Sequence, residues 1–340
     1  MKKLLAAVLT IAVGFVFLLN VGGFVSADNE SESQPTVETQ TTTSVPQTTT
    51  KSAPPTTTKK ITPTTTKKTE QPTTKKKTKK KKKKKKKVVK KIIKKKVKFN
   101  RKWKYAKYSK IHSGKAVLYK HSWGKNRKTV AINAGHGTRG GERYKTRCHP
   151  DGSPKLISGS TGKGARYAIS VSSGTSLRGG KSEATATLSE AKILKKQLLK
   201  AGYDVLMIRT GKDVQLDNIA RTLVANHYAD CHLAIHYDSS SKDKGAFFLS
   251  VPNIRSYRNM MPVKKYWKKH NKLGRSTIWG LRKQGVKIYR NGSMPMDLTL
   301  TSYSTVPSID IEIGDKKSST SKKTQTKIAK GIVKGIKKFY

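Results

Sequence analysis

The stretch T-V-A-I-N-A-G-H-G, residues 129–137, decides how the rest of the chain is interpreted. Val130 and Ile132 are β-branched and stand among small side chains, a composition typical of a buried strand. The run ends in a glycine-flanked turn that carries His136, and open α/β sheets place their sites at such strand ends. A single histidine there has two interpretations, a functional side chain or a hydrogen-bonded loop residue.

The chain that follows this strand alternates strand-like and helix-like patterns, which is the signature of an α/β fold. We expect strands at 203–209, 231–236, 245–251 and in one or two segments of 299–314, and helices at 183–202, 216–229, 262–285 and 322–340. Ser182 is a plausible N-cap for the clearest of these helices. The sequence therefore predicts a mostly parallel or mixed twisted sheet of about five to six strands with helices on both faces.

One connection is much longer than the others. Residues 138–182 are polar and rich in Gly and Ser, with no strong periodicity. Structureless loops of this length are uncommon in compact domains and are usually functional. We therefore expect this insert to lie over the site.

The first 27 residues have the layout of a secretory signal peptide, with a basic M-K-K start, an apolar run from Leu4 to Val25, and V-S-A before Asp28. The apolar run is also long enough for an uncleaved membrane anchor, so both interpretations stay open. We expect export of the protein in either case. A membrane is an expected partner only if residues 1–27 remain uncleaved. Export also argues against nucleic acid as a partner.

Positive charge is the exceptional feature of the composition, because 74 Lys and Arg against 19 Asp and Glu give +55. Residues 28–98 are rich in Thr, Pro and Lys, include a polylysine run at 75–87, and are predicted to form a disordered basic arm. Such an arm is either a solvated tail or an electrostatic anchor. For an exported protein we favour an anchor on anionic wall polymers.

The remaining boundaries follow from aromatic content and length. Residues 99–127 are rich in aromatic side chains and are expected to lead into a folded domain over 128–340, which we expect to be a monomer. The two cysteines, Cys148 and Cys231, are too few for a disulfide framework and either pair or remain free thiols.

Four residues stand out by their positions at strand ends and at a helix start: His136, Glu183, His236 and Glu312. The carboxyl ends of parallel strands share one edge of a sheet, so these side chains are expected to lie together. Two histidines and one carboxylate are a common catalytic zinc set, and a second carboxylate can take the proton of a bound water. The combination predicts a hydrolase.

The same positions carry a resemblance to a known family. The motifs are N-A-G-H-G, E-A-T-A-T-L followed by A-G-Y-D-V, I-R-T-G-K-D-V-Q-L with R-T-L-V-A-N-H-Y-A-D, A-I-H-Y-D, and I-D-I-E-I-G. In this order, over about 128–315, the chain resembles the zinc-dependent N-acetylmuramoyl-L-alanine amidases of bacterial cell walls. The resemblance implies hydrolysis of the amide between N-acetylmuramic acid and L-alanine in peptidoglycan. It also implies that His136, Glu183 and His236 bind Zn²⁺ and that Glu312 is the catalytic base.

The chain departs from the family pattern at Asn133, where an aspartate is usual, at Thr138, where glycine is usual, and at Asp315, where phenylalanine is expected. Two further residues are minor alternatives as ligands. Glu190 shares a helix face with Glu183, although a solvated surface glutamate is expected there, and His232 shares a strand face with His236.

Two other functions remain open at this point. A zinc peptidase that cuts a peptide bond of the wall would use the same four residues. A non-catalytic polybasic wall-binding protein would need none of them.

Overall fold

The computed structural model describes residues 91–123 and 127–340. The predicted signal peptide and nearly all of the predicted arm lie outside the described residues. Within the described part, no helix combines the length and the apolar character needed to cross a membrane.

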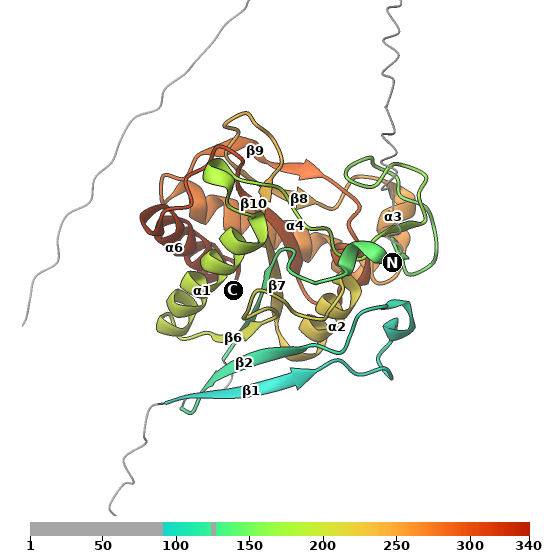
Figure 1. Ribbon diagram of the computed structural model, residues 1–340, viewed down its shortest axis with the longest axis horizontal. Helices are drawn as coiled ribbons and strands as arrows, with labels where there is room; N and C mark the ends of the chain where they lie inside the picture. Colours follow the sequence, from blue (N-terminus) through green and yellow to red (C-terminus); the bar gives the residue numbers. More distant parts are fainter. Residues whose placement is uncertain (1–90, 124–126) are drawn as a thin grey trace, which may run out of the picture. The chain divides into compact units, whose positions relative to one another are not determined.

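An eight-stranded mixed sheet forms the centre of the folded part (Figure 1). Its order is β1 (Ile92–Lys98), β2 (Lys115–His121), β6 (Asp204–Met207), β3 (Thr129–Ala134), β7 (Cys231–Asp238), β10 (Ser308–Asp315), β8 (Ala246–Ser250) and β9 (Ile288–Pro295). The run β6-β3-β7-β10 is parallel, as is β8-β9, whereas the pairs β1-β2, β2-β6 and β10-β8 are antiparallel. The predicted α/β class is confirmed, but the sheet is larger than the five to six strands expected, because β1, β2 and β9 were not predicted.

Helices cover both faces of this sheet, as predicted. On one face α1 (Glu183–Lys200), α4 (Val263–Arg282) and α6 (Lys322–Phe339) pack on β3, β7 and β10 in the largest apolar cluster. On the other face α2 (Asn218–Tyr228) packs on β3, β6 and the β1-β2 pair. The central parallel strands are buried on both sides, which explains their near-continuous apolar sequences.

The remaining elements are short: η1 (Ala106–Tyr108), η2 (Gly141–Arg143), β4 (Lys145–Arg147), β5 (Tyr167–Ile169), η3 (Arg178–Gly180), α3 (Arg255–Asn259) and α5 (Thr299–Tyr303). Residues 299–303 were expected to belong to a strand and are instead the helix α5. The hydroxyl of Ser302 donates to the Leu298 carbonyl, a bond one helical turn long that fits a helix and not a strand.

Residues 92–98, which were predicted to belong to the arm, form the strand β1 of the sheet. Residues 92–98 pair with β2 along a complete antiparallel ladder, and Val97 is buried. The lysines of β1 are exposed, as is usual on an edge strand. The predicted lead-in 99–127 likewise contains β2, so both segments belong to the sheet.

The insert 138–182 is ordered and contains η2, a β4-β5 hairpin and η3. It is held to the rest of the domain by Asp297, whose carboxylate accepts hydrogen bonds from the Lys155 ammonium and from the Leu156 backbone. Cys148, in this insert, and Cys231 are both buried free thiols.

Candidate active site

Three of the four predicted residues meet at one edge of the sheet. His136 follows β3, Glu183 is the first residue of α1, and His236 lies near the end of β7. His136 Nε2 is 2.8 Å and His236 Nδ1 is 3.0 Å from the same carboxylate oxygen, Glu183 Oε1. The two ring nitrogens are 3.1 Å apart. Three donor atoms therefore converge on one point.

The backbone fixes the orientation of His136. Its φ of 61° is left-handed, an unusual conformation for a residue other than glycine that often marks functional sites. Its Nδ1 lies 2.8 Å from the carbonyl oxygen of Ser172, which belongs to the insert. This contact fixes the ring so that its other nitrogen, Nε2, points at the Glu183 carboxylate.

Glu183 is held as a charged carboxylate although it is buried. Its Oε1 accepts a hydrogen bond from the Tyr237 backbone and its Oε2 accepts one from the Thr175 backbone, each at 3.0 Å. Burial opposes ionisation, but the hydrogen bonds with His136 and His236 lower the pKa of Glu183 well below its usual value. The carboxylate is thus negative at any physiological pH.

Two acidic residues of β10 face His236. Glu312 is the direct register partner of His236, and Asp310 lies two residues earlier on the same face. The Asp310 carboxylate is 3.9 Å from His236 Nε2. Burial lowers the pKa of His236, but Asp310 and Glu183 raise it to about 10. Asp310 was missed in the sequence, although strand alternation in I-D-I-E places it beside Glu312.

Glu312 lies in the same cleft without a direct contact to the three converging atoms. One of its carboxylate oxygens is buried and has no hydrogen-bond partner among the described residues. Burial, followed by the charge of Asp310, raises the pKa of Glu312 well above its usual value. A carboxylate in these surroundings is a stronger proton acceptor than one in water.

Two buried arginines support the turn that carries His136. Arg221 donates to the His136 carbonyl at 2.7 Å and to the Asn133 side chain at 3.2 Å. Arg209 donates to the Gly135 carbonyl at 2.8 Å. Two of the departures from the family pattern are thus accommodated here, because Asn133 and Thr138 both accept hydrogen bonds from Arg221.

The third departure from the family pattern, Asp315, is buried and stabilises a connection between strands. Its carboxylate accepts hydrogen bonds from the backbones of Lys244, Gly245 and Lys317. It therefore closes the connection before β8 and does not reach the three converging atoms.

The converging atoms fit a metal ion. His136, Glu183 and His236 offer ligand atoms that all lie within 4.8 Å of one another, and two imidazoles with one carboxylate suit Zn²⁺. Space is kept for them by Gly174, where a Cβ would come within 2.7 to 2.9 Å of His136 and Glu183 atoms. A Cβ at Gly135 would similarly collide with the ring of His236.

The minor alternatives lie outside this cluster. Glu190 is fully buried, so the expectation of a solvated surface glutamate is wrong. Neither Glu190 nor His232 has a side-chain hydrogen bond among the described residues, and neither belongs to the converging set.

The three residues line a cleft of about 600 Å³, together with Glu312 and Asp310. The insert supplies much of one wall, as predicted, through residues that include Ile169, Val171 and Ser173. Opposite walls come from β8 and β9, with Phe247 and Met294. The cleft is therefore partly apolar and is closed in by a segment that also orients His136.

A family model described as N-acetylmuramoyl-L-alanine amidase matches residues 130–338, more than half of the chain. The chain belongs to the N-acetylmuramoyl-L-alanine amidase family. The reaction of these amidases is hydrolysis of the bond between N-acetylmuramic acid and L-alanine in peptidoglycan. A second model, described as the New glue protein family, matches residues 1–107, which is less than half of the chain.

Several solved amidases are similar to this chain. The apo form of the N-acetylmuramyl-L-alanine amidase Ami1 from Mycobacterium abscessus is 20% identical, with 62% of this chain and 98% of that chain covered and a TM-score of 0.48. The enzyme from Clostridium difficile 630 is 19% identical, with 63% and 97% covered and a TM-score of 0.45. The amidase AmiC2 of Nostoc punctiforme is 18% identical, with 64% and 98% covered and a TM-score of 0.45. No curated protein matches the chain in sequence.

Proposed function

We propose that this amidase is a zinc enzyme in which His136, Glu183 and His236 are the metal ligands and Glu312 is the general base. The observation that carries the proposal is the convergence of His136 Nε2, His236 Nδ1 and Glu183 Oε1 on one point inside the cleft. Zinc, when bound, supplies a Lewis acid that polarises a carbonyl and lowers the pKa of water.

The chain's own residues account for the rest of the reaction. Glu312 accepts a proton at a carboxylate oxygen as the oxygen of water bonds to the lactyl carbonyl carbon of the muramic acid. The carbon–nitrogen bond then breaks, and Glu312 returns the proton to the amine of L-alanine. The products are a carboxylate on the sugar and a free stem peptide.

Asp310 has a positioning role in this scheme. Its carboxylate faces His236 Nε2 and so favours the ring orientation in which Nδ1 points at Glu183. Acidic partners of this kind fix the orientation of metal-binding histidines and increase their basicity.

The proposal is tested by metal content and product mass. The full chain is expected to bind about one Zn²⁺, to lose hydrolysis with a chelator and to regain it with added zinc. Mass spectrometry of purified muropeptides is expected to show release of the intact stem peptide beginning with L-alanine. Release of a shorter peptide would favour a zinc peptidase, and full activity without metal would overturn the proposed zinc site.

We further propose export and retention at the wall, with anionic wall polymers bound by the basic arm. The support is the sequence of residues 1–27 and the polylysine run at 75–87. The activity itself requires access to peptidoglycan, which fits this location. We propose a monomer as the active form, because all five residues of the scheme come from one chain.

A further inference from the structure

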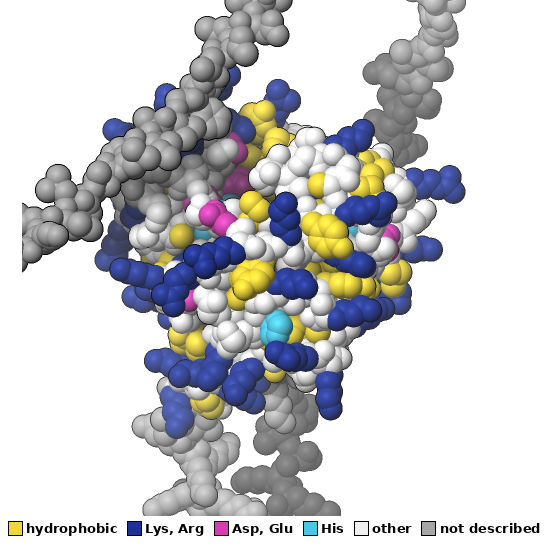
Figure 2. Space-filling view, turned by 45° about the vertical axis from the view of Figure 1, so that its right-hand side comes forward, with side chains coloured by type: hydrophobic (Ala, Val, Ile, Leu, Met, Phe, Trp, Pro, Cys, Tyr) yellow, Lys and Arg dark blue, Asp and Glu magenta, His cyan; other side chains and the backbone are white. Residues whose placement is uncertain are grey.

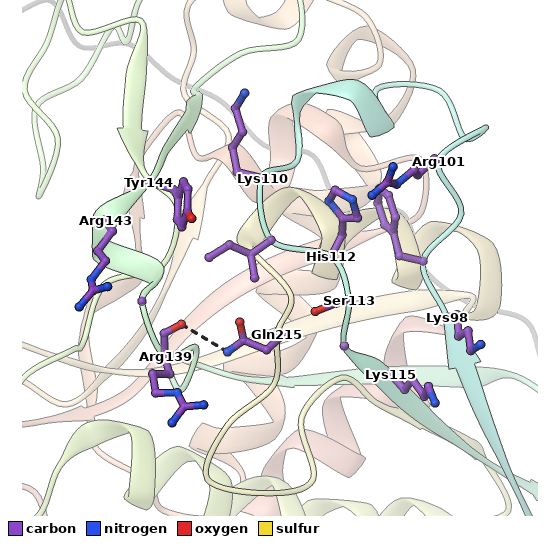
Figure 3. A pocket seen from close by; sticks show the side chains of 14 residues that line it. Lys98, Arg101, Lys110, His112, Ser113, Lys115, Arg139, Arg143, Tyr144 and Gln215 are labelled. Carbon is purple, nitrogen blue, oxygen red and sulfur yellow. Dashed lines mark hydrogen bonds between the residues drawn. The ribbon is translucent and has the colours of Figure 1, made fainter.

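A second cavity lies outside the catalytic cleft and is lined by cations (Figure 3). It has a volume of about 840 Å³. Six basic side chains line it: Lys98, Arg101, Lys110, Lys115, Arg139 and Arg143. They come from the end of β1 and the residues after it, from the segment that leads into the first residue of β2, and from the stretch between His136 and the end of η2. The fold therefore brings them together from distant parts of the chain.

None of these six cations has an ion-pair partner among residues 91–123 and 127–340. No acidic residue lines the cavity. The adjoining Asp213 accepts hydrogen bonds from the Arg139 backbone and the Gln215 amide, and the buried Asp217 accepts them from the backbones of Lys110 and Ile111. These carboxylates therefore hold the walls in place and leave the cations free.

A second observation also indicates an anionic ligand. Lys98 and Lys115 are direct partners in the antiparallel ladder of β1 and β2, and they are its only pair of two cations. Like charges directly opposite each other on one face of a sheet are destabilising. An anion between the two lysines would remove this repulsion.

Hydrogen bonds connect the segments that form the walls of the cavity. The Gly114 backbone donates to the Gln215 carbonyl at 2.7 Å, and a Cβ at Gly114 would lie 2.9 Å from that backbone. The Gln215 amide donates to the Arg139 carbonyl at 3.3 Å, the bond drawn in Figure 3. The cations thus stand on connected segments instead of on one mobile loop.

The site lies next to the catalytic cleft. Tyr144, on its wall, accepts a hydrogen bond at its carbonyl from the Ser170 backbone, and Gly141 accepts one from Val171. Val171 in turn lines the cleft. A ligand in the cavity would therefore lie one loop away from the site of hydrolysis.

We propose that this cavity binds a phosphodiester-linked anionic polymer of the wall. Basic side chains are common over the surface (Figure 2), but here six of them line one concavity, and spread charges suit a chain with repeated charges better than a single small anion. Guanidinium groups bind phosphate oxygens in a two-pronged geometry, and ammonium groups bind them as point charges. Phe99, Ile111 and Tyr144 offer apolar contacts to the carbon chain between phosphates.

The test uses the full chain and a readout that is separate from the polylysine arm and from catalysis. Hydrogen exchange at residues 110–115 and 139–144 is measured with and without a poly(glycerol phosphate) oligomer. The variant K98Q/K115Q is compared with K264Q/K265Q, which removes two exposed lysines from α4 and is matched in charge.

The oligomer is expected to slow exchange in both segments of the parent and of K264Q/K265Q. In K98Q/K115Q the concentration needed should rise about tenfold, because two charge-assisted contacts are lost. The thermal stability of K98Q/K115Q should be equal to or higher than that of the parent, because the repulsion is gone.

Equal protection in the two variants would overturn the proposal, as would protection confined to the arm. Equal or stronger protection by polyglutamate or by oligouridylate of the same length would also overturn it, in favour of a general polyanion site or a nucleic-acid site.

Discussion

Glu312 combines burial, a raised pKa and a place in the same cleft as the proposed metal ligands, so the substitution Glu312→Gln tests proton transfer alone. It keeps the shape of the side chain and removes its basicity. We expect kcat on purified muropeptide to fall by about 10² to 10⁴, the usual cost of losing a general base, with zinc content unchanged. Glu190→Gln is the matched control, because Glu190 is also buried but lies outside the cluster. Activity within a few-fold of the parent would assign the role elsewhere, and loss of zinc would make Glu312 a ligand.

Gly174 leaves the room that the proposed ligands need, so Gly174→Ala should damage the proposed metal site from the backbone side. Its φ is 85°, and an added Cβ would reach His136 and Glu183. Gly164 has a φ of 87° with nothing within 4 Å of such a Cβ, so Gly164→Ala has the same backbone strain, about 1 kcal/mol, without the collision. We expect zinc affinity, measured by competition with a chelating dye, to fall at least about tenfold for Gly174→Ala only. Equal affinities would mean that the site relaxes around the methyl group.

Among the elements, the insert is tied to the rest of the domain in part by the buried carboxylate of Asp297. Burial raises the pKa of this group, but the His149 ring, 3.2 Å away, and hydrogen bonds from the Leu156 backbone and Lys155 lower it to about 2. A lowered pKa means that the carboxylate stabilises the fold fully above its unfolded value, about 3.9, and that this contribution is lost as pH falls toward 2.

Asp297→Asn should therefore loosen the insert at neutral pH, because the amide has one acceptor oxygen and brings a donor against Lys155. We expect faster tryptic cleavage between residues 150 and 166 and a higher KM, with zinc retained. Asp151→Asn, an exposed change in the same insert, is the control. If both variants are cleaved at the parent's rate, Asp297 does not hold the insert.

The sequence predicted best those elements in which the spacing of apolar residues indicates which face is buried. β3, β7 and α1 are buried on the faces that their apolar residues indicate. β1 was predicted to belong to the arm because its lysines and single buried valine, Val97, show no alternation of polar and apolar residues. The strand is stabilised by pairing with β2. β9 contains Asn-Gly and ends in proline, which are signals of a turn. Both strands form because they pair with strands far away in the sequence, and a local sequence pattern carries no information about such pairing.

At the scale of the whole molecule, the meeting of the candidate residues at one edge of the sheet was predictable because parallel strands end together. His136, His236 and Glu312 stand at such ends, and the N-terminus of α1 brings Glu183 to them. The contribution of Ser172 was not predictable, because it acts through a backbone carbonyl that any residue possesses. The roles of the four side chains stay predictions until metal content and rates are measured.

We expect the arm to determine where the enzyme is retained and the folded domain to carry out hydrolysis. The start of β1 marks the boundary between the two parts. Deletion of residues 28–90 should leave hydrolysis of soluble muropeptide near the parent rate, because β1 and the cleft remain intact. Binding to isolated walls should weaken, and binding by the intact chain should fall steeply with salt, since screening limits electrostatic reach to about 8 Å at physiological ionic strength.

Deletion of residues 28–98 is the informative comparison, because it also removes β1, uncovers the edge of β2 and loses the burial of Val97. That longer deletion should lower the melting temperature, whereas the shorter one should not. Wall binding that resists salt, or that survives the shorter deletion unchanged, would show that the folded domain and not the arm retains the enzyme at the wall.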